Sequence, residues 1–177
     1  MSTEETLSAD SGQGKEPGNS LELFLHSATA EAPVVIEVEG TVTIRELLEE
    51  HGEEGEGVWA EDAEEILQLE VTLVTAGIQH RHHLHHNHCR RVDVVAWDGG
   101  GHDVEKNFAP AQTVIRVLDW ALGKDGFNIP EPDWANYEFR TCGGDHAIPL
   151  WVHVGSLVTA GTCGVCLELV KKHNPQG

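Results

Sequence analysis

The chain has 177 residues, among them 30 acidic and 11 basic side chains, and its formal net charge is −19. This excess of carboxylates excludes nucleic acids and anionic membrane surfaces as partners, because contacts with phosphates need lysine and arginine. The apolar runs are far shorter than the roughly 20 residues of a transmembrane helix, and the length suffices for one ordinary domain or two small ones.

Residues 1–20 are polar and acidic, with only Met1, Leu7 and Ala9 as apolar side chains. Such a segment buries too little apolar surface to offset the entropy lost on ordering, so we expect a disordered acidic leader. Because it also lacks the apolar stretch of a secretory signal, we expect a cytoplasmic chain. The four cysteines are then expected to be reduced thiols or metal ligands.

Residues 21–91 show the patterns of several strands and one helix. Alternating apolar and polar side chains at the start of this segment, from Leu21 onward, indicate a strand. A helix is predicted to begin after Thr43, which can cap its first turn, and to end at Gly52. The predicted elements are strands over 21–26, 34–38, 58–60 and 81–90, and a helix over 43–51.

Residues 92–170 predict the same kinds of elements in the same order. Thr113 and Gly123 flank a second amphipathic helix, and the three glycines over 99–101 predict a hairpin turn. The predicted elements are strands over 92–97, 104–108, 137–141, 150–154 and 166–170, and a helix over 113–122.

An internal repeat relates these two segments. The pentapeptide Leu-Val-Thr-Ala-Gly occurs at 73–77 and again, 84 residues later, at 157–161. The first strands of the two segments start 71 residues apart, so one insertion of 13 residues reconciles the two offsets. We therefore predict two tandem copies of one small unit of the α+β class. A hairpin, a helix and shorter strands within about 75 residues are typical of a β-grasp domain.

Several features together resemble tandem ubiquitin-like modifiers: the two β-grasp units, the repeated pentapeptide before the last strand, the direct junction Cys89-Arg90-Arg91-Val92, and the C-terminal Gly177. The pattern is similar to the two-domain, interferon-stimulated modifier of vertebrates. The motifs His88-Cys89-Arg90-Arg91-Val92 and Phe108-Ala109-Pro110 resemble more closely the bacterial ubiquitin-like proteins of anti-phage Bil-type operons. The resemblance covers about residues 21–177.

This resemblance implies a protein modifier that is not itself an enzyme and needs no cofactor. Its implied partners are an activating enzyme that uses ATP, a conjugating enzyme, a deconjugating zinc metalloprotease, and a target such as a phage structural protein. Gly177 would be the conjugated residue, at the end of a flexible tail over 171–177. The tail residues that these enzymes would recognise are Lys171, Lys172, His173, Asn174, Pro175 and Gln176.

Six histidines between residues 80 and 88 support a different hypothesis, a protein that binds or handles metal ions. Side chains two residues apart share one face of a strand, so His83 with His85, or His86 with His88, are candidate ligand pairs. We expect these histidines instead to line a strand beside the acidic residues, without a functional metal site. A tandem β-grasp adaptor that is not conjugated is a further alternative.

The spacing of Cys163 and Cys166 is that of a redox pair or of half a zinc site, which Cys142 and His146 would complete. We expect small buried thiols at these positions instead. The sequence contains no phosphate-binding glycine loop between a strand and a helix, and no nucleophile elbow. The chain is therefore predicted to have no catalytic activity.

Overall fold

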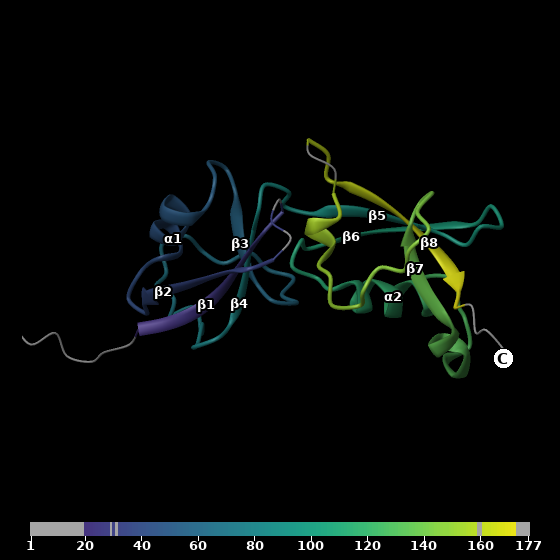
Figure 1. Cartoon of the computed structure of the whole chain (residues 1–177), viewed down its shortest axis with the longest axis horizontal. Helices are drawn as coiled ribbons and strands as arrows, with labels where there is room; N and C mark the ends of the chain where they lie inside the picture. The colour runs from purple at the N-terminus through teal and green to yellow at the C-terminus, as the bar shows by residue number, and fades with distance from the viewer. Residues whose placement is uncertain (1–19, 29, 31, 159–160, 173–177) are drawn as a thin grey trace, which may run out of the picture.

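The computed structural model describes residues 20–28, 30, 32–158 and 161–172. They form two domains, placed one after the other along the long axis of the molecule, each with a four-stranded sheet and an α-helix (Figure 1). The leader expected over 1–20 lies outside the described residues except for Ser20. No helix in the described part of the chain is long and apolar enough to cross a membrane.

Domain 1 is a mixed sheet with one helix packed on it. Its elements are β1 (Ser20–Ser27), β2 (Val34–Glu39), α1 (Ile44–His51), β3 (Gly57–Ala60) and β4 (His83–Asn87). The strand order is β2-β1-β4-β3, with β1 antiparallel to β2 and parallel to β4. Ile44 and Leu47 of α1 are buried against Leu23 and Leu84 of the sheet, so burial of these apolar side chains holds the helix on the sheet.

The helix α1 begins where the sequence predicts. The hydroxyl of Thr43 accepts a hydrogen bond from the Glu46 amide, and the Glu46 carboxylate accepts one from the Thr43 amide, which makes a capping box. Gly52 ends the helix and its amide donates to the Leu48 carbonyl, but its φ is −107°. Because this backbone is extended, the left-handed conformation that favours glycine is not what stops the helix.

Domain 2 repeats this architecture. Its elements are β5 (Val92–Trp97), β6 (Asp103–Phe108), α2 (Val114–Leu122), the 3-10 helix η1 (Glu131–Asn136), β7 (Tyr137–Thr141), the 3-10 helix η2 (Val154–Ser156) and β8 (Gly164–Lys171). The strand order β6-β5-β8-β7 is the order of domain 1. The prediction of two tandem β-grasp domains is therefore confirmed. The final glycines of the two repeated pentapeptides, Gly77 and Gly161, have the same backbone conformation. Both are left-handed, with φ of +77° and +81°.

The strand predicted over 150–154 is wrong. This segment forms no strand and pairs only through an isolated bridge between His153 and Thr113. Its carbonyls accept hydrogen bonds from the first amides of α2, from Val114 to Val152 and from Ile115 to Leu150. The apolar run predicted a strand, but its backbone pairs with the unsatisfied amides of a helix N-terminus instead of with another strand.

The expectation of reduced cysteines is also wrong, because all four are paired in disulfides. Cys89 is bonded to Cys163 and Cys142 to Cys166, with Cα–Cα distances of 5.5 and 5.4 Å. Cys163 and Cys166 are not bonded to each other, since three residues of extended chain span about 10 Å, more than a disulfide bridges. The same pairing leaves no thiolate for a zinc site with His146.

A carboxylate of domain 1 caps the helix of domain 2. Asp62, which follows β3, accepts hydrogen bonds of 2.8 Å from both the amide and the hydroxyl of Thr113. Thr113 is the N-cap residue of α2, and its own side chain makes no capping hydrogen bond. The negative charge of Asp62 thus lies at the positive end of the helix and ties the two domains together.

Two further contacts lie at the interface between the domains. Trp59 of β3 is 1% exposed and packs with Ala109 and Ala111, which precede α2. The Asn87 side chain at the end of β4 donates a 3.2 Å hydrogen bond to the Gly155 carbonyl. A Cβ atom at Gly155 would lie 2.7 Å from Asn87 Nδ2, so this position needs glycine for close approach of the domains.

We expect Asp62→Ala to lower the free energy of unfolding of domain 2 by about 1–2 kcal/mol, the usual effect of losing a helix cap. Asp62→Asn is the matched control, because it keeps an acceptor oxygen and tolerates the positive φ of 54° at this position. Urea unfolding followed by far-ultraviolet circular dichroism measures both variants. Equal losses in the two variants would mean that the cap is not what Asp62 contributes.

Candidate functional site

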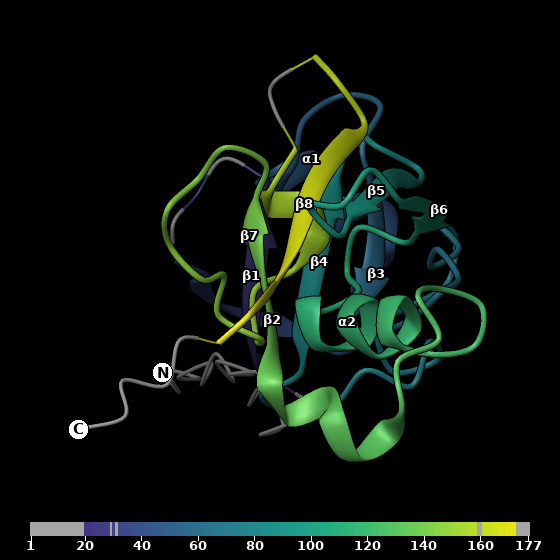
Figure 2. The ribbon, with the colours of Figure 1, turned by 90° about the vertical axis from the view of Figure 1, so that its right-hand side faces the viewer.

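The strand β8 leads to the tail in which conjugation is predicted. It is an inner strand, parallel to β5 and antiparallel to β7 (Figure 2). Leu167 and Leu169 of this strand are 0% and 5% exposed and belong to the core of domain 2. Because β8 has hydrogen-bonded neighbours on both sides, the sheet fixes the place and direction in which the chain leaves the domain.

The first residues of the predicted tail are held against domain 2. Lys171 is the last residue of β8, opposite Tyr137. The Lys172 amide donates a 2.7 Å hydrogen bond to the Asn136 carbonyl, and Lys172 Nζ donates one of 2.8 Å to the Ala135 carbonyl. Lys171 and Lys172 are therefore ordered by the strand and by η1, which differs from the flexible tail predicted from residue 171. The remaining candidates, His173, Asn174, Pro175, Gln176 and Gly177, lie outside the described residues.

The four histidines proposed as metal ligands lie in different environments. His83 and His85 share one face of β4, as the strand period predicts, and both stack on His26. His86 faces the other side, where its Nδ1 lies 2.6 Å from Glu56 Oε2 in a buried contact. His88 lies beyond the end of β4, with Nε2 3.4 Å from Cys89 Sγ. These four residues do not form one site.

A different set of three histidines meets at the boundary between the domains. His26 lies beside His85 in the parallel pairing of β1 and β4, and their ring centroids are 4.4 Å apart. The His153 ring, from the segment before η2 in domain 2, lies 3.9 Å from the His85 ring and 5.2 Å from the His26 ring. One ring nitrogen of each residue lies within 4.8 Å of those of the other two. We call this set the interdomain histidine cluster.

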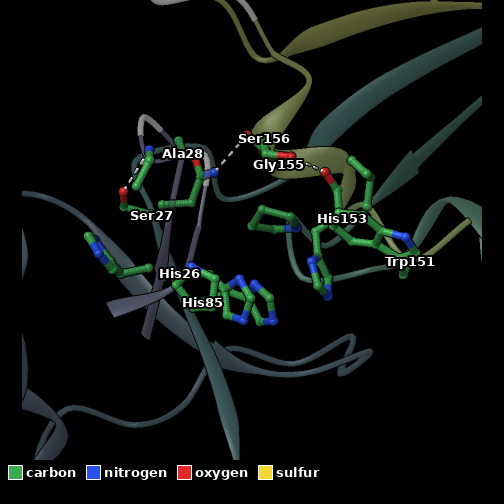
Figure 3. A pocket seen from close by; sticks show the side chains of 14 residues that line it. His26, Ser27, Ala28, His85, Trp151, His153, Gly155 and Ser156 are labelled. Atoms are coloured by element: carbon green, nitrogen blue, oxygen red, sulfur yellow. Dashed lines mark hydrogen bonds between the residues drawn. The ribbon is translucent and has the colours of Figure 1, made fainter. Parts of the chain in front are cut away.

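The interdomain histidine cluster lines a pocket of about 310 Å³. Figure 3 shows His26 and His85 next to each other and His153 facing them from the domain 2 segment. Trp151, which is 72% exposed, lies at the rim of this pocket. The cluster is therefore reached from solvent although its central ring, that of His85, is only 4% exposed.

Burial keeps these imidazoles neutral. Burial is the larger cause and the neighbouring His153 and His83 the smaller one, and together they lower the pKa of His26 to about 4 and that of His85 to about 2. Burial also lowers the pKa of His153, while the nearby Glu61 carboxylate acts in the opposite direction. Neutral rings at pH 7 have a free lone pair on one nitrogen, which is the form that binds metal ions.

A second group of possible ligands is chemically blocked. His88, Cys89 and Cys163 bring three potential ligand atoms within 4.8 Å of one another. The two sulfurs, however, are joined in a disulfide. A metal is bound by thiolates, so this group has no thiolate to offer while the bond is intact.

Sequence reasoning missed His26 and His153. A signal for His26 existed, because a β-grasp domain pairs its first and last strands in parallel. His26 lies near the end of β1 and is the register partner of His85 in β4. No comparable signal existed for His153. Its place in the cluster depends on the packing of domain 2 against domain 1, and its segment was predicted to be a strand.

Comparison with known proteins identifies one family for part of the chain. Residues 95–172 match the model of BilA ubiquitin-like domain 2. Curated protein sequences give no match. Among solved structures, ubiquitin of Caldiarchaeum subterraneum matches with 18% identity and a TM-score of 0.37, over 48% of this chain and 98% of that chain. The matched domain is of a class that is not enzymatic, in keeping with the non-catalytic chain predicted from the sequence. The second domain of this chain is similar to the second ubiquitin-like domain of BilA proteins.

Proposed function

We propose that this chain is a ubiquitin-like protein modifier that is joined to target proteins through the carboxylate of Gly177. The observation that carries the proposal is the match of residues 95–172 to a BilA ubiquitin-like domain, which ends at the point where β8 leaves domain 2. From Lys172 the five residues to Gly177 can extend about 17 Å. That reach lets a terminal carboxylate enter the active site of an enzyme that is docked on the domain.

The chemistry requires partners, because the modifier supplies only a carboxylate. An activating enzyme would adenylate the Gly177 carboxylate with ATP, which releases pyrophosphate, and transfer it to its own cysteine as a thioester, which releases AMP. A conjugating enzyme would then pass it to a lysine amine of the target, forming an isopeptide bond. A zinc metalloprotease would cleave that bond and release the modifier.

The size and charge of the modifier suggest how conjugation would act in a bacterium under phage attack. Each conjugation would add 19.3 kDa with a net charge of −19 to one surface lysine. On a phage structural protein, a mass of this size would block assembly contacts sterically. The hydrogen bonds that hold Lys172 to η1 would keep the start of the tail at a defined place on domain 2.

Reconstitution with the activating and conjugating enzymes of a Bil-type operon tests this proposal. We expect ATP-dependent adducts that are heavier than the target by the mass of one modifier, and mass spectrometry should find Gly177 linked to a lysine. Deletion of Gly177 should abolish the adducts. A chain in which Gly177 is kept and residues 1–19 are removed is the control, and it should still be conjugated.

A chain extended by one residue beyond Gly177 adds a second control, since its Gly177 carboxylate is blocked until the metalloprotease removes the extension. Adducts that persist without Gly177 would refute the proposed linkage. Enzymes that bind the chain without forming adducts would indicate an adaptor instead of a modifier.

A further inference from the structure

We propose that the interdomain histidine cluster, His26, His85 and His153, is a zinc site that fastens the two domains to each other. The three ligand nitrogens lie within 4.8 Å of one another, and they come from β1, from β4 and from the segment before η2. Imidazole nitrogen is a preferred ligand of Zn²⁺, and three protein ligands with one open position are a common zinc arrangement.

The strongest evidence is a pair of buried ring nitrogens without hydrogen-bond partners. His85 Nε2 and His153 Nε2 have none among the described residues. Both atoms are buried, the whole of His85 is 4% exposed and the His153 side chain is 11% exposed, so a partner for these nitrogens has to come from the adjoining pocket. Leaving such atoms unpaired is unfavourable, and a metal ion that accepts both lone pairs removes this cost.

Neighbouring side chains provide the outer contacts that a metal site needs. His26 Nε2 lies 2.8 Å from His83 Nδ1, and a His26 ring that donates this hydrogen bond keeps the lone pair of its other nitrogen for a metal. Glu61 Oε1 lies 3.4 Å from His153 Nε2, at ion-pair distance but without hydrogen-bond alignment. This carboxylate is near enough to balance the charge of the cation.

The pocket has the room that coordination requires. Tetrahedral zinc with bonds of about 2.0–2.1 Å needs ligand nitrogens about 3.3 Å apart. The rings of the cluster are partly stacked, with interplanar angles of 20° to 59°, so they must turn to point their nitrogens at one ion. The adjoining space of about 310 Å³ (Figure 3) accommodates this rotation and a water molecule as fourth ligand.

Bound zinc would act on the arrangement of the domains. The domains already meet through Asp62 and Thr113 on one side and through Asn87 and Gly155 on the other. A metal that joins β1 and β4 to the segment before η2 adds another point of attachment. Each added point restricts the relative orientation of the domains, so zinc should stiffen the tandem and stabilise both domains together.

Zinc titration of the untagged, full-length chain tests the site. The protein is kept oxidised, so that the Cys89–Cys163 disulfide remains closed, and is stripped of metal with a chelator. We expect one zinc per chain in competition with a chromophoric chelator. His26→Gln and His153→Gln should each weaken the affinity by at least about 100-fold, since even loss of an outer contact weakens metal binding by about 10- to 100-fold.

His102→Gln with His146→Gln is the matched control, because both residues are exposed and lie outside the cluster; its affinity should equal that of the wild type. Cobalt provides an independent signal, with visible bands of a tetrahedral ion and no thiolate charge-transfer band. Zinc should also raise the thermal midpoint of the wild type and leave that of His153→Gln unchanged. The proposal is overturned by absence of binding, by equal binding in the cluster variants and the control, or by a thiolate band.

Discussion

Replacing Cys89 and Cys163 together by alanine is expected to lower the free energy of unfolding by about 4 kcal/mol. This disulfide closes a loop with a sequence separation of 74 residues, and the entropy that such a crosslink removes from the unfolded chain corresponds to about 4 kcal/mol. Only His88 separates Cys89 from the end of β4. The bond therefore also holds the junction between the domains against the loop before β8, and guanidinium unfolding under non-reducing conditions measures its effect.

The second disulfide provides the matched control for this prediction. Cys142 and Cys166 are 24 residues apart, so their double alanine variant should lose about 3 kcal/mol, less than the first variant. Titration of thiols in the unfolded wild-type protein should find no free thiols. A protein that shows four free thiols, or a Cys89/Cys163 variant as stable as the wild type, contradicts the disulfide assignment.

Trp59→Ala is expected to lower the free energy of unfolding by about 3–5 kcal/mol, the usual range for removing a buried aromatic side chain. Trp59 belongs to β3 of domain 1, but the buried residues that it packs with, Ala109 and Ala111, belong to domain 2. The cavity would open at the interface itself. We therefore expect the two domains to unfold in separate steps in this variant. Calorimetry should resolve two transitions in the variant, whereas the unfolding of the two domains should be more strongly coupled in the wild type.

Trp151→Ala is the control for this effect, since the same residue type is removed where it is 72% exposed. Surface substitutions of this kind change the stability by about 0.5 kcal/mol or less. If Trp59→Ala and Trp151→Ala behave alike, Trp59 does not hold the domains together.

The elements of both domains followed from short-range patterns. The alternation from Leu21 and from Val92 matches β1 and β5, and Thr43 begins α1 through its capping box. Periods of 2 and 3.6 residues are set by the backbone, so they survive in any tertiary context that buries one face. The segment over 150–154 shows the limit of this reasoning, because an apolar run does not say which backbone groups its carbonyls will meet.

Only part of the candidate site could be predicted from the sequence. The His-rich segment drew attention to His85, and the parallel pairing of first and last strands in a β-grasp domain would have added His26. The cysteines could not be assigned in the same way. Four cysteines permit three pairings, and the actual one depends on β8 lying next to β7 and close to the domain junction.

The sequence by itself determined the tandem β-grasp architecture and the strand that leads to the tail, because both are encoded in local periodicity and in the repeat. Only the tertiary structure decided what happens between the domains: the disulfide from Cys89 to Cys163, the cap that Asp62 places on α2, and the meeting of His153 with His26 and His85. These contacts join residues far apart in sequence. Their geometry is set by the packing of two surfaces, and such packing produces no periodic pattern of residues in the sequence.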